Sequence, residues 1–96
     1  MKIKRLVLDV LKPHQPSVIE YADKITELEG IEGLTLNVME IDDKTQTVEI
    51  AMEGDDLPFE DIKRVIGELG GAIHSIDQVS AGSRIVPTTG KEMRLV

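Results

Sequence analysis

The stretch that decides the fold is LTLNVMEIDDKTQTVEIAM, residues 34–52. Apolar side chains recur at every second position in its two halves, and the polar residues Asp42, Asp43 and Lys44 separate these halves. Alternation with a period of two is typical of strands, and adjacent aspartates between two such runs are typical of a turn. We therefore predict an antiparallel hairpin in the middle of the chain.

A helix is predicted on each side of this hairpin. The sequence S-V-I-E forms a capping box that starts one helix at Ser17, and apolar residues follow at helical spacing up to a glycine stop at Gly30. The second helix opens at Pro58, because proline is tolerated in a first turn where its missing N–H would be unpaired, and it ends at Gly70.

Extended segments are predicted at the two ends, IKRLVLDVL at residues 3–11 and AIHSIDQV at residues 72–79. The complete order is strand, helix, strand, strand, helix, strand, which is that of the α+β, ferredoxin-like βαββαβ sandwich. Right-handed crossovers place strands one and three in the middle of a four-stranded antiparallel sheet, with both helices on one face. We predict a domain over residues 1–86 and a C-terminal tail, residues 87–96, that acts as an arm between subunits.

The sheet face opposite the helices has no cover within this arrangement. Alternation places on it a mixture of apolar and polar residues, namely Arg5, Val7, Asp9, Leu11, Thr35, Asn37, Met39, Ile41, Thr47, Glu49 and Ala51. Exposed apolar surface tends to mark an interaction site, and edge strands also invite pairing. We therefore expect a homo-oligomer.

Composition limits the classes of function. With 96 residues, of which 41% are hydrophobic, the chain is sufficient for one core, and without cysteine it has no thiolate site. A net charge of −7 disfavours binding to nucleic acid. No apolar run approaches the roughly 20 residues of a membrane span, so we expect a cytoplasmic protein without membrane contact.

Charge is distributed unevenly along the chain. Residues 13–83 carry 16 acidic and 4 basic side chains, a net −12, so the two ends together carry +5. The basic ends of one subunit are suited to meet the acidic surface of a neighbour, although a chain this short can also acquire basic ends by chance.

A candidate metal site combines Asp9, His74 and Asp77. Strand 72–79 is predicted to run antiparallel to strand 3–11, which would bring these side chains together across the ladder. The alternative is that His74 bonds to a backbone carbonyl and that Asp77 is solvated. Alternation gives conflicting faces for this strand, because His74 falls in phase with Ile76 whereas Ile73 falls in phase with Asp77, and a bulge would reconcile them.

A second candidate site is the acidic run Glu53, Asp55 and Asp56, which continues into the start of the second helix. Carboxylate oxygens suit Ca²⁺ or Mg²⁺, but acids before a helix also complement the positive end of its dipole. No arrangement of nucleophile, base and orienting group is recognisable, so the sequence does not favour an enzyme.

The segments RLVLDVLKPHQPS at residues 5–17, MEGDDLPFEDI at residues 52–62 and GGAIHSIDQVSAG at residues 70–82 together resemble the archaeal family named domain of unknown function 211. The resemblance implies a ferredoxin-like fold, a cytoplasmic archaeal protein and a ring-like homo-oligomer, without an established activity. The tail is less similar to the family.

The function favoured by these observations is a non-enzymatic, oligomeric module, regulatory in kind, that binds a divalent cation or small metabolite at subunit boundaries. One alternative is a small metal-dependent enzyme that uses Asp9, His74 and Asp77. Another is an amino-acid sensor similar to the ACT domains. Those domains commonly carry a glycine in the loop after the first strand, and the loop at residues 12–16 has none.

Overall fold

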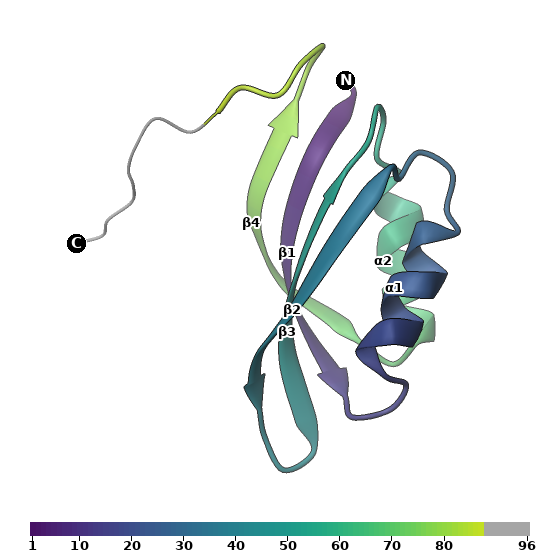
Figure 1. Ribbon diagram of the computed structural model, residues 1–96, viewed down its shortest axis with the longest axis vertical. Helices are drawn as coiled ribbons and strands as arrows, with labels where there is room; N and C mark the ends of the chain where they lie inside the picture. The colour runs from purple at the N-terminus through teal and green to yellow at the C-terminus, as the bar shows by residue number, and fades with distance from the viewer. Residues whose placement is uncertain (88–96) are drawn as a thin grey trace, which may run out of the picture.

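The computed structural model describes residues 1–87 and has the predicted order of elements. These are β1 (Ile3–Pro13), α1 (Val18–Thr26), β2 (Gly33–Ile41), β3 (Thr45–Glu53), α2 (Phe59–Glu68) and β4 (Ala72–Ala81). The strands form one antiparallel sheet in the order β2-β3-β1-β4, and both helices lie on one face of it (Figure 1). The α+β, ferredoxin-like prediction is confirmed. The predicted tail lies outside the described residues from position 88 onward.

The helix boundaries follow from local chemistry. The hydroxyl of Ser17 accepts the backbone N–H of Glu20 at 3.3 Å, as the capping box requires. Helix α1 ends at Thr26, earlier than predicted, and Gly30 then turns the chain with a positive φ of 101°. Helix α2 starts after Pro58, which occupies the N-cap position and carries no side-chain cap.

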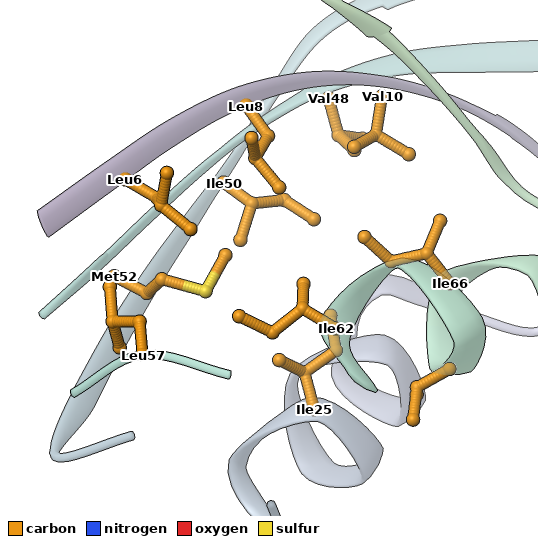
Figure 2. Packing of buried hydrophobic residues seen from close by; sticks show 11 residues of the cluster. Leu6, Leu8, Val10, Ile25, Val48, Ile50, Met52, Leu57, Ile62 and Ile66 are labelled. Carbon is orange, nitrogen blue, oxygen red and sulfur yellow. The ribbon is translucent and has the colours of Figure 1, made fainter. Parts of the chain in front are cut away.

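The core lies between the sheet and the two helices. Leucine, isoleucine, valine and methionine side chains from β1 and β3 point toward isoleucines of the helices (Figure 2). The cluster of buried residues comprises Leu6, Leu8, Val10, Ile25, Val48, Ile50, Met52, Leu57, Ile62, Val65 and Ile66. Burial of each such side chain contributes about 1.5–3 kcal/mol, so this cluster provides the main stabilisation of the domain. No helix within residues 1–87 is long and apolar enough to cross a membrane.

Three β-bulges interrupt the alternation of the edge strands. In β4, His74 and Asp77 are each an extra residue relative to β1, which confirms that a bulge reconciles the conflicting faces of this strand. In β2, Met39 is an extra residue, because Val38 lies opposite Val48 but Glu40 lies opposite Thr47. Since side chains alternate between faces, each extra residue moves the residues that follow to the other face.

The bulge at Met39 corrects the predicted face of Ile41. Ile41 lies opposite Gln46, which shares the core-facing alternation of Val48, so Ile41 belongs to the helix side of the sheet. The uncovered face is therefore less apolar than predicted. Val7 lies on that face but is only 8% exposed, and Leu11, also on that face, is 42% exposed.

Candidate functional site

Exposed apolar side chains lie at one edge of the sheet on β2. Val38, Met39 and Ile41 are between 42% and 65% exposed, and we call these three residues the β2 margin. Val38 and Ile41 are on the helix side by their register, but the helices do not extend over this end of the hairpin. These side chains are therefore left without a cover from the described residues of their own chain.

A second apolar patch lies at the opposite edge, on β4. Ile76 and Val79 are 51% and 56% exposed, and we call these two residues the β4 margin. They lie opposite the core residues Leu8 and Leu6, so they too are on the helix side of the sheet. The closed end of the β2–β3 hairpin and the C-terminal end of β4 extend past the helices in opposite directions (Figure 1).

The uncovered face of the sheet is mainly polar and is ordered by its own side chains. The guanidinium of Arg5 donates from Nη1 to Glu53 Oε2 at 2.6 Å and from Nε to Gln78 Oε1 at 2.6 Å. The backbone of Val7 lies opposite that of Gln78 on the same face. This face consequently needs less cover from a partner than the sequence suggested.

The predicted ligands Asp9, His74 and Asp77 are not drawn into a metal site. Asp9 lies opposite Ser75 and Glu49 in the ladder, and the Ser75 hydroxyl donates to Asp77 Oδ1 at 2.7 Å. His74 is exposed on its bulge. Within residues 1–87, no three His, Cys, Asp or Glu side chains converge in a way that could hold a metal ion. The metal site remains a prediction.

The acidic run is engaged by cations of the same chain. Asp55 accepts from Lys4 Nζ at 2.6 Å and from Lys2 Nζ at 3.2 Å, and Glu53 accepts from Arg5. The hydrogen bonds from Lys4 and then Lys2 lower the pKa of Asp55 below its ordinary value. Asp56 is exposed beside them. The basic residues near the N-terminus thus find intrachain partners and do not require the acidic surface of a neighbour.

A polar cluster that the sequence reasoning missed surrounds Lys12. Within residues 1–87 it is the only charged side chain that is fully buried. Its ammonium donates to the carbonyl of Pro13 at 2.7 Å, to Gln46 Oε1 at 2.9 Å and, at 3.4 Å, to the carbonyl of His14. Nζ also lies 4.9 Å from the centre of the Tyr21 ring. Burial lowers the pKa of Lys12 and raises that of Tyr21.

The alternation of β1 contained the signal for this cluster. Leu6, Leu8 and Val10 point into the core, and the next residue in that series is Lys12. Gln46 lies directly opposite Lys12 in β3. The same corner is closed by the Tyr21 hydroxyl, which donates to the carbonyl of Leu69 at 2.9 Å.

The loop after β1 is also bound to the hairpin turn through His14. Its Nε2–H donates to the carbonyl of Asp42 at 2.8 Å. Together with the Lys12–Gln46 bond, this contact joins the loop to both sides of the hairpin's closed end. The end of the hairpin that carries the β2 margin is therefore held from within the molecule.

Comparison with known proteins places this fold in a family. The profile of domain of unknown function 211, described as uncharacterized ArCR, matches residues 4–94. The chain belongs to this family. The match extends beyond the segments that carry the resemblance in the sequence and includes most of the tail. The uncharacterized protein MJ0319 of Methanocaldococcus jannaschii is 48% identical over 84 residues, which cover 88% of this chain and 87% of that protein.

Proposed function

We propose that this member of the domain of unknown function 211 family is a non-enzymatic module that assembles with itself, the β2 margin of one copy packing against the β4 margin of the next. The observation that carries the proposal is the pair of exposed apolar margins at opposite edges of one sheet, with Val38 and Ile41 of one and both residues of the other on its helix side. Apolar patches of this kind on a small domain favour burial against a partner.

Side-chain packing is the expected mode of contact, in preference to strand addition. Two bulges, at His74 and Asp77, interrupt the free edge of β4, and bulges of this kind impede edge-to-edge pairing. Each copy carries a net charge of −7, so copies repel one another at long range and the contact has to depend on apolar burial. Raising salt to about 1 M, where the Debye length is roughly 3 Å, should therefore leave the assembly intact or strengthen it.

A contact between two different margins is heterologous, so each copy retains one free margin until the assembly closes. Closure would give the ring-like form that the family resemblance implies. The same boundary would bring Asp42, which follows Ile41, toward Asp77 of the next copy. A divalent cation such as Ca²⁺ or Mg²⁺, or a small cationic metabolite, would then be held by carboxylates from two copies.

The test uses one charged substitution on each margin. We expect wild-type protein to sediment as an oligomer at low micromolar concentration, and Ile41→Lys and Val79→Lys each to sediment as smaller species. Ile19→Lys is the matched control, because Ile19 is an apolar residue of α1 that is 78% exposed and belongs to neither margin. Circular dichroism and urea unfolding establish that each variant is folded.

Mixing the two variants distinguishes the proposed contact from a symmetric one. Ile41→Lys retains an intact β4 margin and Val79→Lys retains an intact β2 margin, so an equimolar mixture should form a one-to-one heterodimer. A wild-type monomer would refute self-assembly. A wild-type oligomer whose variants do not recombine would retain self-assembly but exclude the β2-to-β4 contact. Loosening by salt would support pairing of charges instead.

A further inference from the structure

The closed end of the hairpin depends on a buried amine for its connection to the rest of the domain. The side chain of Lys12 points from β1 to the core side of the sheet, and Gln46 of β3 lies opposite Lys12 in the ladder. The remaining acceptors are the carbonyls of Pro13, the last residue of β1, and of His14, in the loop that follows. One side chain therefore binds the loop and the hairpin at the same time.

The number of donors matches the number of acceptors. A protonated lysine has three N–H donors, and the three acceptors around Nζ are all neutral oxygens. No carboxylate within residues 1–87 is paired with Lys12, and the Tyr21 ring provides the remaining favourable contact with the cation. These groups surround the ammonium as a cation-binding site would, and the bound cation is the side chain of Lys12 itself. We call this arrangement a cation cage.

We propose that Lys12 is a positioning residue that locks the β2–β3 hairpin to the β1–α1 loop and so sets how the β2 margin is presented to a partner. This inference rests on the proposed self-assembly for its consequence, but the lock itself is independent of it. Without the ammonium, Gln46 and the carbonyls of Pro13 and His14 lose a shared donor. The hydrogen bond from His14 to the carbonyl of Asp42 still joins the loop to the hairpin turn.

The first experiment compares Lys12→Met with Lys24→Met by amide hydrogen exchange. Methionine preserves most of the buried length without a donor, and Lys24 is an exposed lysine of α1 that serves as the control. We expect exchange at His14 and Gln15 and in residues 42–46 to become about ten- to a hundredfold faster in Lys12→Met, the factor that matches loss of charge-assisted hydrogen bonds. Exchange at the core positions of β1 and β3 should change far less. Unchanged exchange in both segments would overturn the proposal.

Chemical rescue separates the cation from simple packing and remains informative if Lys12→Met is poorly folded. In Lys12→Ala, which keeps Cβ, n-propylammonium at millimolar concentration should restore slow exchange at His14 and Gln15 and in residues 42–46, whereas n-propanol should not. Equal rescue by both compounds, or rescue by neither, would refute a cation cage.

The consequence for assembly is measured last, by sedimentation. Self-association of Lys12→Met should be weakened about tenfold or more, and Lys24→Met should associate like the wild type. If the wild type is monomeric, the proposed self-assembly is refuted. The exchange results still show whether Lys12 holds the hairpin to the loop. If exchange accelerates but association is unchanged, the lock exists without controlling the β2 margin, and the proposed consequence is wrong.

Discussion

The hydroxyl of Tyr21 offers a sharp test of how the corner around Lys12 is held. Tyr21 is fully buried, its hydroxyl donates to the carbonyl of Leu69 at 2.9 Å, and its ring lies 4.9 Å from Lys12 Nζ. Tyr21→Phe removes the hydroxyl and keeps the ring. Tyr21→Leu removes both, so the pair of variants measures the two interactions separately.

The expected magnitudes follow from these contacts. Loss of a buried hydrogen bond that leaves a carbonyl without its donor should lower the free energy of unfolding by about 1.5 kcal/mol in Tyr21→Phe. Tyr21→Leu also replaces the ring by a smaller side chain, which reduces core packing and removes the cation–π contact with Lys12. The free energy of unfolding should therefore fall by about 3 kcal/mol in this variant. In a domain of this size, about 1.5 kcal/mol lowers the melting temperature by roughly 6–12 °C.

Urea unfolding at pH 7, followed by circular dichroism, measures both changes, and unchanged slopes would show that the unfolded state is unaltered. Repeating both substitutions in Lys12→Met completes a double-mutant cycle. The difference in free energy of unfolding between Tyr21→Leu and Tyr21→Phe should be smaller in Lys12→Met than in the wild type, because the cation is absent. A Tyr21→Phe cost below about 0.5 kcal/mol would refute the hydroxyl bond as a stabilising contact. An additional ring cost that is the same in both backgrounds would refute the coupling to Lys12.

Three further perturbations test other parts of the structure. Gly54→Ala should destabilise the domain by about 3 kcal/mol, because a Cβ there overlaps the carbonyl of Gly30, whereas Gly33→Ala, with open space around its Cβ, should change urea stability little. The lowered pKa of Asp55 means that its ion pairs with Lys4 and Lys2 stabilise the fold above the ordinary carboxyl range, and that this contribution is lost as pH falls through the folded-state pKa. Asp55→Asn should therefore unfold more easily than wild type at pH 7 and equally easily at about pH 2, and an equal difference at both values would exclude the pairing. Mn²⁺ binding measured by calorimetry should be retained in His74→Ala and at pH 5.5 but lost in Val79→Lys, because carboxylates at the boundary are the proposed ligands. Loss of affinity in His74→Ala would instead assign the imidazole as a ligand.

The fold was predictable because its signals are local and repeated. The alternation of residues 34–52 and the cap at Ser17 each depend on neighbours in the chain, and the order of elements then limits the topology. The bulges were harder to place. The conflict of phases in residues 72–79 revealed a bulge in β4, but no comparable conflict marked Met39, so Ile41 was assigned to the wrong face.

The candidate site was less predictable because it depends on which surfaces the helices leave open. How much of the sheet the helices cover depends on their length and position in space. Alternation along a strand therefore cannot show that Ile76 and Val79 lie on the core side of the sheet and yet remain exposed. Lys4 and Asp55 form an ion pair although they are far apart in the sequence. The charge distribution along the chain could not show this pair, so it suggested a contact between subunits for a lysine that is paired within its own chain. Lys12 was overlooked for a different reason, because a lysine at the end of a strand usually reaches solvent.

The central position of β1 has a consequence for biosynthesis. β1 ends at Pro13 and lies between β3 and β4, yet β4 begins only at Ala72. At a ribosomal rate of roughly 5–20 residues per second, the β4-facing edge of β1 waits about 3–12 s for its neighbour. During that interval a nascent chain presents an unpaired strand edge that includes Leu6 and Leu8, and the β4 of another chain can pair with it. Crowded polysomes should therefore favour strand-exchanged dimers, and dilute refolding should favour the closed domain.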